Sequence, residues 1–307
     1  MNFLKKLGQY PDVCIQCHNA PDSDTIGAAF GVYRYLTWKG IPASMVYGGE
    51  TPIKKYNLKL LLSECGIPLH FIRRQPKTSL LLVVDAQYGN TNVETFDAPE
   101  TAIIDHHIPT VPDHELYLIR PEYQSCSTMV WELLKEEGYP VENDHALCTA
   151  LLYGLYIDTS SFSSLYHDAD VRMKLDLMSE RNALFERLTM SNMSIAEMMI
   201  ATDAMHNHYL DIDHRFAIIS ALECEQSVLG VIGDFMIQID MVNVCIAYTQ
   251  KNDRYQFSIR SCIDDYPANE IAAAISNQVG GGGGHLTKAG GGIQISAMEQ
   301  IFGDIDI

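Results

Sequence analysis

A short apolar run that stops at three ligand-type side chains constrains this chain more than any other feature of its sequence. Residues Ala102 to Ile104 are too few for a helix, so they predict a buried strand. Asp105, His106 and His107 follow it directly. In open α/β sheets, ligands bind beyond the carboxyl ends of the strands. A carboxylate and two imidazoles in that position indicate metal chemistry, although the triplet alone is equally compatible with a surface loop.

Similar side chains follow other predicted elements of the first 160 residues. They come after a strand over 13–17, after a strand over 79–84 and after a helix that ends near residue 156: His18, Asp22, Asp24, Asp85 and Asp158. One aspartate in such a place is usually a helix cap, but several in one sheet favour a shared site. Carboxylates and imidazoles suit Mn²⁺, Mg²⁺ or Fe²⁺. The ligands are too many for one ion, whereas two ions about 3.5–4 Å apart would use them all and suit in-line displacement at phosphorus.

Strands alternate with helices along the first half of the chain, and the strands are continuously apolar. This pattern predicts an α/β fold with a doubly wound, mainly parallel sheet. A helix is expected to begin at Ser125 or Ser127, and the segment 170–210 has a helical, Met-rich pattern. Further strands are predicted over 216–222, 244–248 and 255–259. We therefore expect a metal-binding domain over 1–190, a helical connector over 191–212 and a smaller α/β domain over 213–307.

Composition narrows the class of protein. The chain has 307 residues and a net charge of −18, which disfavours a stable grip on long nucleic acid. The sequence has no long apolar stretch and no apolar signal core, so we expect a cytoplasmic protein that does not bind membranes. The eight cysteines are scattered and predict buried small side chains rather than disulfides. The sequence leaves the oligomeric state open and allows a homodimer.

Six segments resemble the motifs of one family, in order. HNAPDSD, VVDA, IIDHH and LYIDTSSF resemble the four motifs of the DHH phosphoesterase family, and FSIRS and GGGGHLTKAGG resemble two signatures of its associated C-terminal domain. The DHH triplet and the GGGGH run are the specific ones. The two-domain form is similar to bacterial nano-RNases and 3′-phosphoadenosine-5′-phosphate (pAp) phosphatases.

The resemblance implies roles for the N-terminal residues. One metal ion would be held by His18, Asp22 and Asp85. The other would be held by Asp24, Asp85, His106 and Asp158, with Asp85 as the bridge. His107 would contact the scissile phosphate or its leaving oxygen, and Asp105 would orient an imidazole. The two ions would be Mn²⁺ in the first place, with Mg²⁺, Co²⁺ or Fe²⁺ as alternatives.

In the C-terminal domain the resemblance implies a substrate site. Arg260 would grip a phosphate through two hydrogen bonds, and the glycine run would form a nest of backbone N–H groups for an anion. The residues implied are Arg260, Ser261, Gly282, Gly283, Gly284 and His285. The sequence departs from the family pattern at Ser23, Thr25, Ser160 and Lys288, which removes no implied ligand but puts the choice of substrate in doubt.

The activity implied is hydrolysis of short oligonucleotides, linear dinucleotides or pAp by a hydroxide held between two metal ions. The substrate would fit between the two domains and contact both. Alternatives are a pyrophosphatase or exopolyphosphatase of the same superfamily, a RecJ-like single-strand exonuclease, and a non-catalytic nucleotide-binding protein.

Overall fold

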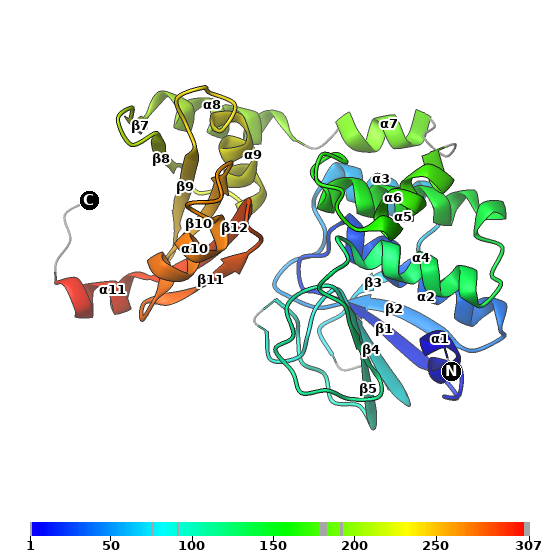
Figure 1. The fold of residues 1–307 in the computed structure, drawn as a ribbon. Coiled ribbons are helices and arrows are strands. Elements are labelled where there is room, and N and C mark those ends of the chain that lie inside the picture. Colours follow the sequence, from blue (N-terminus) through cyan, green and yellow to red (C-terminus); the bar gives the residue numbers. More distant parts are fainter. Residues whose placement is uncertain (1, 75–76, 91, 179–182, 191–192, 304–307) are drawn as a thin grey trace. The chain divides into compact units, whose positions relative to one another are not determined.

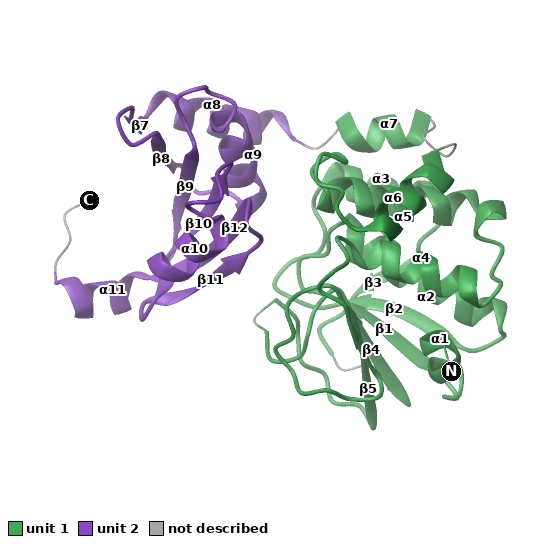
Figure 2. Cartoon of the chain, in the orientation of Figure 1, with its two compact units in different colours: residues 1–192 green, residues 193–307 purple. Residues whose placement is uncertain are grey.

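The computed structural model describes residues 2–74, 77–90, 92–178, 183–190 and 193–303. The chain divides into two compact units, residues 1–192 (unit 1) and residues 193–307 (unit 2), as Figure 2 shows. Each unit has apolar clusters of its own, so each has a separate hydrophobic core. The predicted separation of an N-terminal and a C-terminal α/β unit is therefore visible in the packing.

Unit 1 is built on a six-stranded sheet with the order β3-β2-β1-β4-β5-β6. Every pair of neighbouring strands in it is parallel. The strands are β1 (Val13–Cys17), β2 (Ala43–Tyr47), β3 (Leu69–Phe71), β4 (Leu80–Val84), β5 (Glu100–Asp105) and β6 (Tyr117–Ile119). The α/β class and the mainly parallel sheet predicted from the sequence are confirmed.

Strands β1 and β4 are buried along their whole length, which is why their sequences are continuously apolar. Cys17 at the end of β1 pairs with Val84 at the end of β4, and Val84 pairs with Ile104 of β5. The strand order reverses its direction between β1 and β4, which is where doubly wound sheets bind ligands. The residues that follow these three strands are therefore brought to one edge of the sheet.

Helices cover one face of this sheet, as Figure 1 shows. They are α1 (Phe3–Leu7), α2 (Ser23–Trp38), α3 (Tyr56–Glu64), α4 (Cys126–Glu136), the 3₁₀ turn Val141–Asn143, α5 (His145–Asp158), α6 (Asp168–Leu177) and α7 (Ala183–Met190). Helix α2 packs on β1, β2 and β4, and α4 and α5 pack on α2. On the other face, Val93 and Phe96 pack against alternate side chains of the strands.

Close contact between these helices needs glycine at one position in particular. A Cβ atom at Gly154 of α5 would lie 2.2 Å from the hydroxyl of Ser127 and 3.0 Å from Asp24 Cα. No side chain fits there, so the glycine allows α5 to approach the beginnings of α2 and α4.

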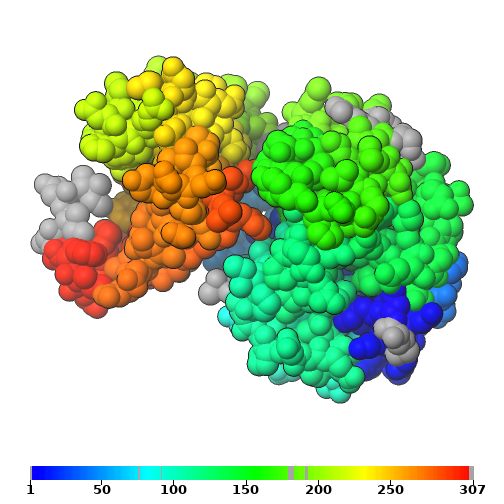
Figure 3. All heavy atoms as spheres, in the orientation of Figure 1, coloured from blue at the N-terminus to red at the C-terminus, as the bar shows by residue number. Residues whose placement is uncertain are grey.

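The N-terminal residues pack on the surface of unit 1. Lys6 donates a hydrogen bond to the Glu115 carbonyl oxygen, and Asn2 donates one to the Glu136 carboxylate. In Figure 3 the blue N-terminal residues accordingly lie against teal and green segments.

Unit 2 contains a six-stranded mixed sheet with the order β11-β12-β10-β9-β8-β7, in which only β8 and β9 are parallel. Helices α8 and α9 pack on one another and on the sheet, and α10 packs on β10, β11 and β12. The elements are α8 (Ile195–His206), β7 (His208–Asp211), β8 (Phe216–Ala221), α9 (Gln226–Met236), β9 (Val244–Lys251), β10 (Arg254–Ser261), α10 (Ala268–Ser276), β11 (Gly280–Gly284), β12 (Lys288–Gln294) and α11 (Ile295–Phe302).

Two local expectations for unit 2 were wrong. The helical pattern does not continue to residue 210, because β7 forms at His208 and pairs with β8. The segment predicted as a helical connector does contain a helix, α8. Ala201 and Ala204 of this helix are buried in the same cluster as Ala217, so α8 packs as part of unit 2. The glycine run is an extended strand at the edge of the sheet and not a nest.

Candidate metal centre

The predicted metal-binding side chains of unit 1 come together at the carboxyl edge of its sheet. Three groups of residues have ligand atoms within 4.8 Å of one another. They are His18, Asp22 and Asp85; Asp24, Asp85, His106 and Cys126; and Asp85, Asp105 and His107. Asp85 belongs to all three groups, so the carboxylate predicted as a bridge lies at the centre of the cluster.

The first group joins β1, the beginning of α2 and the end of β4. His18 Nε2 lies 3.8 Å from Asp22 Oδ1 and 3.7 Å from Asp85 Oδ2. Asp22 also caps α2, because its Oδ1 accepts hydrogen bonds from the backbone N–H groups of Asp24 and Thr25. Burial raises the pKa of Asp22, but the hydrogen bonds from His18 and from these amides lower it more, so its carboxylate stays ionised.

The second group draws side chains from helices α2 and α4, and Asp158 of α5 lies beside it. Asp24 is fully buried, and its two oxygens accept hydrogen bonds of 2.7 and 2.9 Å from the backbone N–H groups of Cys126 and Ser127. Those amides are at the beginning of α4, where the helix dipole favours a carboxylate. Asp158, the last residue of α5, has Oδ2 at 3.4 Å from His106 Nε2, and Asp85 Oδ1 lies 3.3 Å from the same nitrogen.

A backbone contact sets the orientation of the His106 ring. His106 Nδ1 lies 3.2 Å from the carbonyl oxygen of Tyr123. A carbonyl only accepts hydrogen bonds, so the proton is on Nδ1, and Nε2 faces the carboxylates of Asp85 and Asp158. This is the usual arrangement of a metal-binding histidine, with its second nitrogen fixed by the protein.

The third group connects His107 to a buried glutamine. His107 Nδ1 lies 2.8 Å from Asp105 Oδ1, and Asp105 Oδ2 accepts a hydrogen bond of 2.5 Å from Gln87 Nε2. The Gln87 side chain is buried and its carbonyl oxygen accepts hydrogen bonds from Thr110 N and Oγ1 at 2.7 and 3.0 Å. The His107 side chain is 43% exposed, so it is the imidazole of the cluster that most faces solvent.

Asp85 adopts a strained backbone conformation. Its φ is +62°, in the left-handed region that non-glycine residues adopt at a cost of about 1–2 kcal/mol. The chain turns at this residue directly after β4, while its N–H group still bonds to Ile104 of β5 at 2.8 Å. Strain of this kind is concentrated at functional sites.

The cluster holds more carboxylates than imidazoles in a buried place. Burial, followed by the charges of Asp158 and Asp85, raises the pKa of Asp24 well above its usual range. Burial raises the pKa of Asp158 to about 6. Burial lowers the pKa of His106, but the contacts with Asp158 and Asp85 raise it further, to well above its usual value. These shifts have one physical cause, a concentration of negative charge away from water.

Divalent cations fit this arrangement. Asp85 Oδ1 is buried and accepts no hydrogen bond among the described residues. A carboxylate oxygen in that state is costly to bury unless a cation binds it. The donor set of carboxylates and imidazoles is also the one that divalent ions prefer. The residues present are therefore suited to a divalent metal centre, and the sequence did not predict that Cys126 would lie among them.

In unit 2 the structure gives the predicted substrate residues different surroundings. Arg260 of β10 has Nε 2.5 Å from Asp234 Oδ1 and Nη2 3.4 Å from Asp234 Oδ2, a pairing the sequence did not predict. Arg260 Nη1 also donates to Ser258 Oγ at 3.0 Å. The Ser261 hydroxyl is buried and donates to the carbonyl oxygen of Ile263. The edge of the guanidinium group that suits a phosphate is thus occupied by a carboxylate.

The glycine run and His285 form the hairpin between β11 and β12. Gly282 pairs with Gly291, Gly283 with Gly290 and Gly284 with Ala289. A Cβ atom at Gly282 would lie 2.9 Å from the Ala272 carbonyl oxygen, so close packing of α10 excludes a side chain there. His285 is exposed and its N–H donates to the Lys288 carbonyl oxygen at 2.7 Å. The roles of these residues in binding substrate stay predictions.

Comparison with known proteins identifies the family. Residues 12–155 match the model of the DHH family, N-terminal domain, and residues 214–306 match the DHHA1 domain. Together the two models match most of the chain. The protein therefore belongs to the DHH family, which confirms the resemblance to DHH phosphoesterases. Among the described helices, none combines the length and the apolar character needed to cross a membrane.

The chain is similar in sequence to one named relative and in fold to two solved structures. The chain is 25% identical to the cyclic-di-AMP phosphodiesterase GdpP of Geobacillus thermodenitrificans over 92% of its own length and 45% of that protein. An exopolyphosphatase-related protein from Bacteroides fragilis has the same fold, with a TM-score of 0.77 and 18% identity. The match covers 94% of this chain and 90% of that protein. RecJ from Thermus thermophilus, solved with Mn²⁺, gives a TM-score of 0.54 and 15% identity. The match covers 95% of this chain and 51% of RecJ. The chain spans about half the length of the curated relatives it matches.

Proposed function

We propose that this chain is a metal-dependent phosphoesterase that hydrolyses short oligonucleotides, dinucleotides or small phosphorylated nucleotides such as pAp. The observation that carries the proposal is the cluster centred on Asp85, whose carboxylate belongs to three groups of possible ligands. His18, Asp22 and Asp85 would hold one divalent ion, and Asp24, Asp85, His106 and Asp158 the other. Bound divalent ions would lower the pKa of a water molecule and stabilise negative charge on a phosphoryl group.

His107 would act on the substrate itself. Its Nδ1 lies 2.8 Å from Asp105 Oδ1, and its side chain is 43% exposed, so the ring is within reach of a substrate. Burial lowers the pKa of His107, but Asp105 and Asp85 raise it more, so the protonated form is favoured. A protonated imidazole in this position would donate a hydrogen bond to the scissile phosphate or to its leaving oxygen.

Arg260 would bind a further phosphate of the substrate after exchanging its carboxylate partner Asp234. Arginine holds phosphate and carboxylate with the same pair of N–H groups, so the two anions would compete for it. His285 and the exposed edge of β11 are candidates for additional contacts. Substrates with more than one phosphate are therefore the best candidates, which include linear dinucleotides, pAp and cyclic di-AMP, the substrate in the name of the relative GdpP.

Short substrates are proposed because the chain is strongly acidic. A net charge of −18 opposes the repeated Lys/Arg contacts that hold a long strand. The alternatives of a pyrophosphatase or exopolyphosphatase and of a RecJ-like exonuclease share the fold and differ in substrate. Neither is excluded by the residues of unit 1.

The test is a substrate series with the purified full chain, Mn²⁺ and fixed salt. RNA and DNA of two, four and about twenty residues would be compared with pAp, cyclic di-AMP and pyrophosphate, with Asp85→Ala as the control for contaminating enzymes. We expect turnover to fall steeply with length above about four residues. Pyrophosphate as the best substrate would move the chain to the pyrophosphatases. Processive degradation of long strands would indicate a RecJ-like exonuclease. No turnover of any substrate would favour a nucleotide-binding protein.

A further inference from the structure

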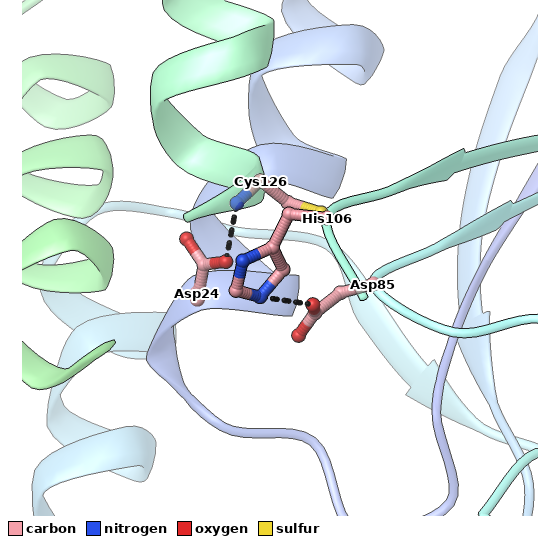
Figure 4. Close-up of side chains that lie close together, drawn as sticks. All are labelled: Asp24, Asp85, His106 and Cys126. Atoms are coloured by element: carbon pink, nitrogen blue, oxygen red, sulfur yellow. Dashed lines mark hydrogen bonds and ion pairs between the residues drawn. The ribbon is translucent and has the colours of Figure 1, made fainter. Parts of the chain in front are cut away.

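We propose that Cys126 is a sulfur ligand of the metal position formed by Asp24, Asp85 and His106, and that it shifts this position toward softer divalent ions. Cys126 is the first residue of α4 and is fully buried. Its sulfur and the ligand atoms of the other three residues all lie within 4.8 Å of one another. Figure 4 shows the four side chains gathered at the ends of their strands and helices. The inference rests on the metal centre of the proposed function.

A second observation points to a ligand at the same place. Asp85 is 3% exposed, and its Oδ1 accepts no hydrogen bond among the described residues while lying 3.3 Å from His106 Nε2. A buried carboxylate oxygen normally accepts one or more hydrogen bonds. A cation placed between Asp85 and its neighbours would satisfy this oxygen, and the sulfur of Cys126 is one of the groups it would meet.

The distances agree with coordination of a single ion after a small movement. Zinc binds thiolate sulfur at about 2.3 Å and carboxylate oxygen at about 2.0–2.2 Å, so two such ligands at a tetrahedral angle lie about 3.6 Å apart. The four ligand atoms all lie within 4.8 Å of one another, so shifts of about 1 Å bring them to this spacing. The Cys126 N–H group already bonds to Asp24 Oδ2 at 2.7 Å, which fixes the backbone on which the sulfur is carried.

The simpler interpretation is that Cys126 is a small buried side chain. Its Sγ lies 3.7 Å from the Ile104 carbonyl oxygen, which is a weak contact of the kind that buried thiols make. Such a contact is given up at little cost because it is weak. Coordination would release the thiol proton to solvent and leave a thiolate on the ion. What distinguishes Cys126 from an ordinary buried cysteine is the set of metal-binding side chains around its sulfur.

A sulfur ligand would change which ion the centre prefers. Oxygen and imidazole ligands suit Mn²⁺ and Mg²⁺, whereas thiolate favours Zn²⁺, Co²⁺ and Fe²⁺. We therefore expect the two metal positions to differ, with the position of His18, Asp22 and Asp85 keeping the preference for harder ions. Cys126→Ser should lower the affinity for Zn²⁺ at least about tenfold. Loss of a residue that only supports a metal ligand already lowers affinity about 10–100-fold, and loss of a ligand should cost no less. The affinity for Mn²⁺ should change less.

The test is the absorption spectrum of the Co²⁺-loaded protein. Wild-type protein is expected to show a thiolate-to-cobalt charge-transfer band in the near ultraviolet, which Cys126→Ser should lose. Cys17→Ser is the matched control, because Cys17 is also buried and its Sγ contacts the Thr25 carbonyl oxygen at 3.7 Å. It should retain the band. A band that persists in Cys126→Ser would overturn the inference.

X-ray absorption of the Zn²⁺-loaded wild-type protein gives a readout that needs no variant. We expect a sulfur scatterer at about 2.3 Å. Zinc bound by oxygen and nitrogen alone would refute the role of Cys126 and leave the proposed metal centre intact. Failure to bind Mn²⁺, Co²⁺ or Zn²⁺ in any amount would instead refute both the proposed metal centre and this inference.

Discussion

Replacing Gln87 with leucine tests whether the site depends on a residue behind the ligands. Gln87 is fully buried, and its amide donates to Asp105 Oδ2 at 2.5 Å and to the Ile108 carbonyl oxygen at 3.1 Å. Its carbonyl oxygen accepts from Thr110 N at 2.7 Å. Leucine has a similar size and none of these groups. Asp105 would then keep His107 with one supporting hydrogen bond fewer.

The cost follows from the partners that lose their hydrogen bonds. A hydrogen bond to a charged group contributes about 1.5–3 kcal/mol and a neutral one about 0.5–1.5 kcal/mol. Since one charged and at least two neutral bonds are lost, and leucine regains part of this by apolar burial, we expect a loss of about 3 kcal/mol. For a unit of this size each kcal/mol corresponds to about 2–4 °C in Tm, so Tm should fall by about 6–12 °C.

Turnover should fall as well, because Asp105 would be held less firmly and would orient His107 less well. Loss of such an outer partner typically costs about 10–100-fold. The matched control is Gln16→Leu, since Gln16 is equally buried and bonds to the Glu94 carbonyl oxygen and to Tyr88 at 2.6 and 3.3 Å. It should lose about 1–2 kcal/mol of stability and keep its kcat. Equal losses of stability in the two variants, with kcat unchanged in both, would refute the reasoning.

Four further outcomes are expected. Asp85→Ala should remove at least one bound divalent ion and lower kcat by more than about 10³-fold. Two bound ions by metal analysis, together with near-normal turnover, would contradict the assignment of Asp85 as the carboxylate shared by both metal positions. Ser160→Gly should raise the free energy of unfolding in urea by about 0.5 kcal/mol, because Ser160 has a φ of +52°; a lower free energy would count against strain at this residue. Arg260→Ala should raise KM about ten- to a hundredfold at unchanged metal content. Asp234→Asn should lower KM, because it removes the carboxylate that competes with the substrate phosphate for Arg260. A higher KM in Asp234→Asn would mean that Asp234 positions the arginine instead. Burial raises the pKa of Asp158 to about 6, above its unfolded value of about 3.9, so the metal-free protein should lose stability as pH rises from about 4 to 6; a flat urea midpoint over this range would argue against a buried proton on Asp158.

The sheet of unit 1 could be predicted because its strands are short, continuously apolar and separated by helical patterns. The positions of Asp85 and Asp105 follow from that sheet, because parallel strands in register end at one edge. Their side chains were therefore expected to meet before any packing was known. The same reasoning reached His18, since β1 and β4 are neighbours in the strand order.

Residues brought to the site by helix packing could not be predicted in this way. Cys126 reaches the cluster because α4 packs on α2 and presents its first amides to Asp24. Sequence patterns indicate that a helix begins near Ser125, but they do not say which buried side chain its first turn meets. Gln87 was missed for a similar reason, because its partners Asp105 and Thr110 come from a later segment.

The glycine run shows how a local pattern is decided by its partner. Five glycines in a row favour an irregular loop, since glycine weakens a strand. In unit 2 they form β11, because β12 carries glycine opposite three of them and because α10 approaches Gly282 too closely for a side chain. A Cβ atom at Gly291 would lie 2.5 Å from the Gly281 carbonyl oxygen. The strand therefore follows from close packing, which the run does not encode by itself.

The strain and the charge of the metal centre together imply that cations contribute to the stability of unit 1. Asp85 has a left-handed backbone, and Ser160, Ser161 and Phe162 after Asp158 have φ values of +52°, +63° and +66°. Buried carboxylates add a further cost, which shows in the raised pKa of Asp24. A bound ion removes this electrostatic cost only in the folded state. At 100 times its dissociation constant an ion adds about 2.7 kcal/mol, which offsets the strain of about 1–2 kcal/mol at Asp85 and part of the strain at the three residues after Asp158.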